Sequence, residues 1–437
     1  MHDEDGFHPV REQTRVLVTG AGGFIGHNLV RYLVDRGYYV RGVDLKHPSY
    51  ESSPAAEFHR VDLRSADDCL ASTRGIDQVY HLAANMGGIG FIEQNKAIIT
   101  HDNTLIDIHM LEASRVNGIR RFLYTSSACV YPRRLQERVD VAPIREEQAY
   151  PAEAEDGYGW QKLIIERLCR HYREDYGLRT YVARLHNIFG PSGEWRGGRE
   201  KSPAAICRRV ALASSDEWIE VWGDGMQTRS YCYISDCIRG IYLLMQSEHC
   251  DPVNIGQDRL VSINELVDIV ATIARKSIGK RHDLGKPQGV RGRNADISVM
   301  RTVTGWKPEV SLEEGLERTY SWVIDQVRKS QRERAERAEQ AVLGAAVELR
   351  KAVSMALGDL ADLIDRLCIV NLKIWHLEEA IRDNSKPDEE IGRLTRTLTP
   401  LNEQRATLKN RINELTGLGV QDDKIYGGSI TSGDHDD

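Results

Sequence analysis

The chain lacks a long apolar run, a cysteine pairing motif and a strong excess of charge of one sign. No stretch of its 437 residues approaches the ~18 consecutive apolar residues of a membrane span, so we expect no membrane association. Its eight cysteines contain no Cys-x-x-Cys pair, which predicts reduced thiols and no metal site. The net charge of −7 does not provide the cationic field that nucleic-acid binding needs. Because the acidic N-terminus also lacks an export signal, we expect a cytoplasmic protein.

The chain does contain short β-branched runs that alternate with helical patterns. Strands are predicted at 15–19, 39–44, 78–82, 122–125 and 180–184. Strands that alternate with helices indicate right-handed βαβ units and a parallel sheet. We therefore expect an α/β fold. A Rossmann-like doubly wound sheet would occupy residues 14–185, and a smaller substrate-binding lobe would lie mainly within 186–330.

Composition changes near residue 330, where a charged, alanine-rich segment begins. Apolar residues then recur in steps of three or four along two stretches, namely Leu357, Leu360, Ile364, Leu367, Ile374 and Ile381, then Ile391, Leu394, Leu398, Leu401, Leu408, Ile412 and Leu415. A polar turn separates them, so residues 331–418 are predicted to form an all-α, coiled-coil hairpin. Because such a hairpin rarely folds alone, we expect it to pack on the rest of the protein or on a second copy. Residues 1–13 and the polar tail 419–437 are predicted to be disordered.

The sequence Thr-Gly-Ala-Gly-Gly-Phe-Ile-Gly at 19–26 lies where the first predicted strand turns into a helix. Gly20 permits the tight turn, Gly23 lets the backbone approach a pyrophosphate, and Gly26 lets the helix pack on the sheet. The backbone amides at the helix start, Phe24 and Ile25, would then face the phosphates together with the positive end of the helix dipole. This pattern predicts a dinucleotide site.

Two acidic residues extend that prediction. Asp44 ends the second predicted strand, where a carboxylate binds the ribose hydroxyls and repels a 2′-phosphate, so NAD is expected rather than NADP. Asp62 follows a further apolar residue. We consider two roles for it, an acceptor for the adenine amino group and a helix N-cap before Ser65.

A second motif supplies candidate catalytic residues. Tyr158 and Lys162 are four residues apart, so on a helix they share one face. The lysine charge can lower the pKa of the phenol until it acts as a base. Together with the glycine spacing and with Ser126 and Ser127 at a strand end, the motif resembles the extended short-chain dehydrogenase/reductases. The resemblance implies that Ser127, Tyr158 and Lys162 form the catalytic set and that the last two also contact NAD.

Six further segments are similar to those of one branch, the GDP-mannose 3,5-epimerases. They are ANMGGIGF (84–91), SSACVYP (126–132), HNIFGP (186–191), GGREKSPAA (197–205), WGDGMQTRS (222–230) and VRGRN (290–294). The likeness spans residues 14–330 and implies a GDP-mannose substrate, with GDP-L-galactose as product and GDP-L-gulose as a side product. Transient oxidation at C4 by NAD makes the protons at C3 and C5 acidic. Cys129 and Lys201 would serve as the base and acid on opposite faces of the sugar.

The same resemblance implies a set of substrate-binding residues, in which arginine forks suit bidentate anion contacts. They are Gly87, Ser127, Asn187, Glu200, Lys201, Arg209, Gln227, Arg229 and Arg293.

Departures from the branch pattern at Asn85, Ser202 and Arg209 keep a related GDP-hexose or GDP-heptose open as the substrate. A 4,6-dehydratase or 4-epimerase is a further alternative, although a dehydratase would carry an acidic residue where Val130 follows Cys129. The non-enzyme alternative is an NAD-binding scaffold whose hairpin recruits partners. We expect a homodimer, and we keep open a higher oligomer formed through the hairpin.

Overall fold

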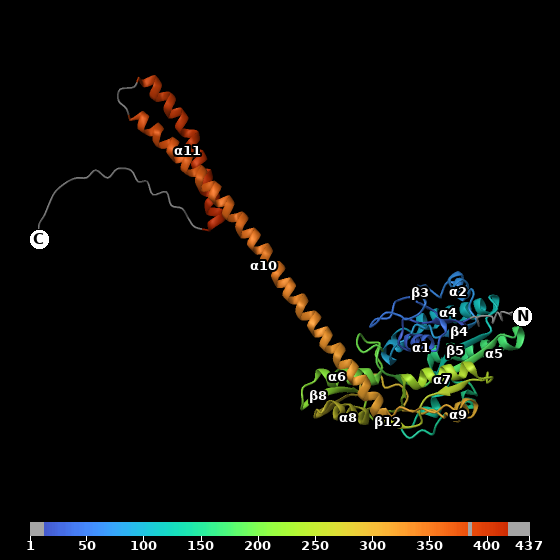
Figure 1. The fold of residues 1–437 in the computed structure, drawn as a ribbon. Coiled ribbons are helices and arrows are strands. Elements are labelled where there is room, and N and C mark those ends of the chain that lie inside the picture. The colour runs from blue at the N-terminus through green and yellow to red at the C-terminus, as the bar shows by residue number, and fades with distance from the viewer. Residues whose placement is uncertain (1–12, 383–386, 418–437) are drawn as a thin grey trace, which may run out of the picture. The chain divides into compact units, whose positions relative to one another are not determined.

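The computed structural model describes residues 13–382 and 387–417. The predictions of disorder for 1–13 and 419–437 therefore fall, except at Gln13, outside the described residues. The chain divides into two compact units that meet at residue 330. The first contains every strand that Figure 1 labels, and the second contains only helix within the described residues.

A seven-stranded sheet in the order β11-β6-β5-β4-β1-β2-β3 forms the centre of the first unit, and all its pairings are parallel. Its strands are β1 (Arg15–Thr19), β2 (Tyr39–Asp44), β3 (Glu57–Arg60), β4 (Gln78–His81), β5 (Arg121–Ser127), β6 (Arg179–Leu185) and β11 (Val253–Ile255). The α/β prediction is confirmed. Sequence periodicity missed β3 and β11, and β11 returns to the central sheet from the segment expected to form the substrate lobe.

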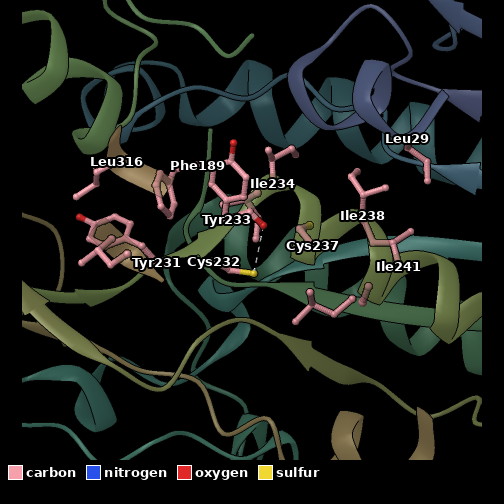
Figure 2. Close-up of a cluster of buried hydrophobic side chains, with 14 of the residues drawn as sticks. Leu29, Phe189, Tyr231, Cys232, Tyr233, Ile234, Cys237, Ile238, Ile241 and Leu316 are labelled. Carbon is pink, nitrogen blue, oxygen red and sulfur yellow. Dashed lines mark hydrogen bonds between the residues drawn. The ribbon is translucent and has the colours of Figure 1, made fainter. Parts of the chain in front are cut away.

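Helices cover both faces of this sheet. They are α1 (Phe24–Val34), α2 (Ala66–Thr73), α3 (Ile89–Gln94), α4 (Lys96–Val116), α5 (Asp156–Tyr176) and α7 (Ile234–Gln246). Side chains alternate along a strand, so Val16 and Val18 join the core beneath α1 and α7, while Leu17 joins the core beneath α2, α4 and α5. Figure 2 shows the first core, where Leu29 of α1 lies near Ile238 and Ile241 of α7.

The substrate lobe is built from short excursions between these elements. Its strands are β7 (Ile188–Phe189), β8 (Glu217–Trp222), β9 (Thr228–Ser230), β10 (Cys232–Tyr233), β12 (Leu260–Ser262), β13 (Ile278–Asp283) and β14 (Gly292–Arg293). Its helices are α6 (Ser202–Leu212), α8 (Ile263–Ala274) and α9 (Ser298–Thr304). Three short 3-10 turns, η1 (Ala128–Val130), η2 (Arg133–Gln136) and η3 (Glu146–Ala149), follow β5. Within the lobe, β12, β9 and β14 form a three-stranded sheet in which β9 and β14 pair in parallel.

The C-terminal extension consists of α10 (Leu312–Ile381) and α11 (Asp388–Thr416). The composition change near 330 does not begin a new helix, because α10 continues through it. Alanine and long charged residues there are good helix formers. Within the second unit, α11 folds back along the last part of α10 (Figure 1). Among the described residues, no helix combines the length and apolar content needed to cross a bilayer.

The hairpin buries a slightly different stripe from the predicted one. Val370 and Ile374 of α10 and Ile412 of α11 are buried, as the three-and-four spacing requires. Leu357 and Ile364, which were assigned to the same seam, are instead 61% and 45% exposed. These two residues lie one position around the helix from the seam, so α10 carries a broader apolar face than α11 covers.

Candidate active site

The glycine loop between β1 and α1 has little space for side chains. Gly20 adopts φ +70°, and a Cβ there would lie 2.9 Å from the backbone nitrogen of Ala83. A Cβ on Gly26 would come within 2.1 Å of the Gly20 carbonyl oxygen, so only glycine lets the helix approach the loop. Gly23 is the N-cap of α1, which leaves the amides of the first helical turn free for an anion. These residues fit a bound pyrophosphate.

Asp44 lies at the carboxyl end of β2, beside the same loop. One of its oxygens accepts from the Gly22 amide at 3.0 Å and the other from the Lys46 amide at 3.1 Å. A cleft lined by Gly22, Gly23, Lys46, Tyr50 and Glu194, among other residues, opens next to it. The carboxylate is therefore fixed where the hydroxyls of the adenosine ribose of a dinucleotide would lie.

Asp62 has a different local role from the helix cap considered above. Its carboxylate forms a 2.6 Å ion pair with Arg64, and that hydrogen-bonded partner lowers the pKa of Asp62. The N-cap of α2 is Ser65, whose hydroxyl accepts from the Asp68 amide. The capping alternative for Asp62 is therefore wrong, and its contact with adenine stays a prediction.

Tyr158 and Lys162 lie on one face of α5, and both are buried. The Lys162 ammonium is 4.5 Å from the centroid of the Tyr124 ring and 6.0 Å from that of Tyr158. Burial raises the pKa of Tyr158 and Cys129 raises it further, while the Ser127 side chain acts to lower it. Burial lowers the pKa of Lys162, and the Asp107 carboxylate opposes that shift. The phenol, the hydroxyl and the ammonium therefore share one desolvated site.

Asp107 is a charged residue of this site that the sequence did not reveal. It is fully buried on α4 and lies 3.7 Å from the Lys162 ammonium. Three side chains donate to it or share a proton with it: His81 at 2.9 Å, Tyr124 at 2.7 Å and Gln161 at 2.7 Å. The only sequence signal was a carboxylate within an apolar helical pattern, and that signal does not identify its partners.

The network continues from His81 to the cofactor loop. The other ring nitrogen of His81 lies 2.8 Å from the Thr19 hydroxyl, and that hydroxyl accepts from the amides of Leu82 and Ala83. A hydrogen-bonded chain therefore joins the end of β1, where the dinucleotide loop begins, to the catalytic helix. It fixes the Lys162 ammonium relative to the predicted nicotinamide side of the loop.

Cys129 lies in η1, directly after β5. The hydroxyl of Ser127 accepts from the Cys129 amide at 3.2 Å, and the Arg293 guanidinium approaches the sulfur at 3.7 Å. Burial raises the pKa of the Cys129 thiol, with Glu155 adding to the shift and Arg293 opposing it. The turn packs tightly on α5, because a Cβ on Gly159 would come within 2.3 Å of the Cys129 carbonyl oxygen.

Lys201 is the N-cap of α6, and the residue as a whole is exposed. Desolvation by the surrounding atoms lowers the pKa of its ammonium, while Cys129 raises it. The two predicted acid/base residues therefore lie within electrostatic range of each other, although they are far apart in sequence. Cys129 lies in the turn that follows β5 of the main sheet, and Lys201 begins helix α6 of the substrate lobe.

Two glycine-rich segments hold Lys201 in place. The Gly88 amide donates to the Arg199 carbonyl at 3.1 Å, and a Cβ on Gly88 would lie 2.8 Å from the Glu200 carbonyl oxygen. Gly87 lies against the Phe91 ring, where a Cβ would be 2.8 Å from the ring. The Glu200 carboxylate accepts from the Gly198 amide and pairs with Arg208 at 3.0 Å. Glu200 therefore shapes the loop that precedes Lys201.

Two predicted anion ligands lie side by side. Arg229 of β9 and Arg293 of β14 are register partners on neighbouring strands. Arg229 donates to the backbone carbonyls of Thr228 at 2.7 Å and Gln288 at 3.2 Å. Burial lowers the pKa of Arg229 to about 10, and Arg293 acts in the same direction. Arg293 is ion-paired with Glu155, whereas the hydrogen bonds of Arg229 go to uncharged carbonyls, so the charge of Arg229 favours binding of an anion.

The other predicted substrate residues are engaged in local contacts. Asn187 adopts φ 43° and donates to the Ser230 carbonyl at 2.9 Å. Gln227 is buried and donates to the Trp222 carbonyl at 2.8 Å. Arg209 contacts the Glu220 carbonyl and lies 3.6 Å from the Glu220 carboxylate. The roles of these three residues in substrate binding therefore stay predictions.

Two family models match the chain. Residues 16–256 match the NAD dependent epimerase/dehydratase family. Residues 307–424 match a family described as a protein of unknown function (DUF4254). The second match covers both helices of the extension.

The chain is similar to two curated plant proteins and to a solved bacterial structure. It is 46% identical to GDP-mannose 3,5-epimerase 1 of Oryza sativa subsp. japonica over 320 residues, which are 73% of this chain and 84% of the rice protein. It is 43% identical to GDP-mannose 3,5-epimerase of Arabidopsis thaliana over 351 residues, which are 80% of this chain and 92% of that protein. The structure of UDP-glucose 4-epimerase from Thermotoga maritima with UDP-glucose matches with a TM-score of 0.66 and 26% identity, covering 72% of this chain and 100% of that one.

Proposed function

The chain belongs to the NAD-dependent epimerase/dehydratase family, and from this premise we propose that it inverts C3 and C5 of GDP-mannose. The product is GDP-L-galactose, with GDP-L-gulose as a side product. The observation that carries the proposal is the grouping of Cys129, Lys201 and Tyr158 at one site, together with relatives that are named for this reaction. We assign the activity to residues 14–330, with the cofactor core in 14–185 and the substrate lobe mainly in 186–330.

The cofactor half of the site performs the preparatory chemistry. NAD, when bound, supplies reversible hydride acceptance at C4, which acidifies the neighbouring C–H bonds of the sugar. Tyr158, as the phenolate, accepts the proton of the C4 hydroxyl, and the Ser127 side chain supports this role because it acts to lower the pKa of the phenol. The Lys162 ammonium stabilises the phenolate because it stays close to the Tyr158 ring in a desolvated environment.

The substrate half moves the carbon-bound protons. Cys129 and Lys201 come from different lobes, so a hexose between them meets one proton-transfer group on each face. Each inversion needs removal of a proton on one face and return of a proton on the other. Positioned proton transfer of this kind contributes about 10²–10⁴-fold per step. Arg229, which is half-buried and hydrogen-bonded only to backbone carbonyls in the described structure, is assigned to the diphosphate.

Proton NMR of the product formed from GDP-mannose in D₂O tests the proposal. A 3,5-epimerase incorporates deuterium at two carbon positions without loss of water, and replacing either Cys129 or Lys201 by alanine abolishes the double exchange. A 4-epimerase incorporates none, a 4,6-dehydratase releases water, and a scaffold leaves the sugar unchanged. Any of these three results contradicts the proposal. Turnover of a related GDP-hexose or GDP-heptose at a much higher kcat/KM would reassign the substrate.

We also propose a homodimer formed through α4 and α5, in the cytoplasm. These helices pack on each other, and their outer surfaces expose Ile98, Ile108, Trp160 and Ile164. Clustered apolar side chains of this kind mark interaction surfaces. The eight cysteines are free thiols, as a reducing compartment requires.

We propose that the hairpin joins such dimers into a higher oligomer. Beyond the seam covered by α11, α10 exposes a second apolar stripe that includes Leu343, Val347, Leu357, Leu372 and Trp375. The stripe is self-complementary in an antiparallel pair, because Leu343 then lies opposite Trp375 and Val347 opposite Leu372.

Light scattering of the full chain tests this assignment. Replacing both Leu357 and Leu372 by glutamate should lower the oligomeric mass while turnover is retained, and ending the chain after residue 334 should have the same effect. Thr399→Glu on the exposed face of α11 is the matched control and should leave the mass unchanged. An unchanged mass in both the double variant and the truncated chain contradicts the role of the hairpin.

A further inference from the structure

We propose that Glu155 and Gln136 are positioning residues that hold the Arg293 guanidinium against the Cys129 thiol, so that Arg293 controls the protonation of Cys129. The inference rests on the proposed function, since it assigns the residues that prepare one of its two proton-transfer groups. Neither Glu155 nor Gln136 belongs to the site predicted from sequence. It also changes the role of Arg293, which the sequence assigned to the substrate.

Three side chains form a closed hydrogen-bonded ring. The Nε of Arg293 donates to Gln136 Oε1 at 2.7 Å, and the Nε2 of Gln136 donates to Glu155 Oε1 at 2.8 Å. Arg293 Nη2 completes the ring by pairing with the same Glu155 oxygen. The remaining direction of the guanidinium, at Nη1, points to the Cys129 sulfur at 3.7 Å. Each nitrogen of the Arg293 guanidinium therefore has one partner within the protein.

The backbone holds the members of the ring in place. The Glu155 amide donates to the Cys129 carbonyl at 2.9 Å, and the Arg291 amide donates to the Gln136 carbonyl at 2.9 Å. Gln136 and Arg293 are 1% and 9% exposed. A Cβ on Gly292 would come within 2.2 Å of the Arg138 carbonyl oxygen, so glycine is required for β14 to approach the segment that follows η2. The ring is therefore a rigid feature of the site.

The charges of the ring act on the thiol in opposite directions. Burial raises the pKa of Cys129 and Glu155 raises it further, whereas Arg293 and the Ser127 hydrogen bond lower it. Tyr158, Lys201 and Arg229 are the other titratable or charged groups that interact with this thiol. Without Glu155, the guanidinium would lower the pKa of Cys129 further and favour the thiolate more strongly. With Glu155 bound to it, the guanidinium still stabilises the thiolate but leaves the thiol able to return a proton, which inversion requires.

The pH dependence of Cys129 alkylation tests the ring without any sugar. The experiment uses a full-length variant with Cys250→Ser and Cys368→Ser. These two substitutions remove the other thiols that are not buried. Iodoacetamide labelling of the Cys129 peptide is then followed by mass spectrometry across the pH range. Glu155→Gln keeps the size and one acceptor oxygen but removes the negative charge that raises the pKa of Cys129, so the labelling midpoint should fall. Gln136→Leu releases the guanidinium and should raise the midpoint.

Glu153→Gln is the matched control, because Glu153 is two residues away, exposed and paired with Arg134. Its midpoint should equal that of the parent protein. Midpoints that move in opposite directions for Glu155→Gln and Gln136→Leu support the ring, and any other pattern overturns it. The D₂O exchange experiment on the parent protein distinguishes a failure of the proposed ring from a failure of the proposed function. Unmoved midpoints with intact exchange overturn the ring alone, whereas absent exchange overturns the proposed function whatever the midpoints.

Discussion

Replacing Asp107 by asparagine removes one buried negative charge and leaves the size of the side chain almost unchanged. In the parent protein this carboxylate lies among His81, Tyr124 and Gln161, and 3.7 Å from the Lys162 ammonium. The asparagine offers one acceptor oxygen to these groups, and its NH₂ faces at least one donor. Breaking a buried ion pair from one side costs about 3–5 kcal/mol. That is a large share of the roughly 5–15 kcal/mol that stabilises a typical domain.

Urea unfolding followed by tryptophan fluorescence measures this loss of stability. The signal reports mainly on the first unit, because Trp375 is the only tryptophan beyond residue 330. Asp140→Asn is the control, since Asp140 forms an exposed ion pair with Arg138, and it should leave the unfolding midpoint unchanged. A second comparison adds Lys162→Met to Asp107→Asn. The double variant should be less destabilised than the sum of the single variants, because no uncompensated charge is left buried.

The pH dependence supplies an independent check. Burial alone would raise the pKa of Asp107, but the Lys162 ammonium and the donors from His81 and Tyr124 lower it below its ordinary value. A carboxylate of this kind stabilises the fold above its unfolded-state pKa of about 3.9, and the contribution is lost as the pH falls through the folded-state pKa. The difference in the free energy of unfolding between the parent protein and Asp107→Asn should therefore be largest near neutral pH and should disappear in acid. If Asp107→Asn lowers the free energy of unfolding at neutral pH no more than Asp140→Asn does, the reasoning is refuted.

Further substitutions test the rest of the site. Gly26→Ala should weaken NAD binding at least tenfold in calorimetry, because the new Cβ would lie 2.1 Å from the Gly20 carbonyl oxygen, whereas Gly344→Ala has open space and should bind normally. Asp44→Ser should lower the affinity for NAD and narrow its preference over NADP in fluorescence titration, and an unchanged preference would contradict the role of this carboxylate. Tyr158→Phe should lower turnover by about 10²–10⁴-fold and abolish carbon-bound deuterium exchange as well, since oxidation at C4 must come first; retained exchange would show that another base acts there.

Much of the fold and of the cofactor site could be predicted from the sequence, because both depend on local patterns. Alternating strands and helices predicted the parallel sheet, and the family resemblance is confirmed by the relatives. Two short strands, β3 and β11, escaped prediction since runs of three or four residues carry little periodicity. The continuity of α10 was missed for a related reason. A change from apolar to charged residues marks where packing changes, and it does not mark where a helix ends.

The sequence by itself determined the features that a few neighbouring residues control. Glycine spacing sets the dinucleotide turn, and a four-residue step places Tyr158 and Lys162 on one face of a helix. Only the tertiary structure decided which charges meet. Arg293 and Gln136 are 157 residues apart in the chain. His81 at the end of β4 pairs with Asp107 of α4. Hydrogen bonds and ion pairs act over a few ångströms of space, so their partners become defined only when folding brings distant segments together.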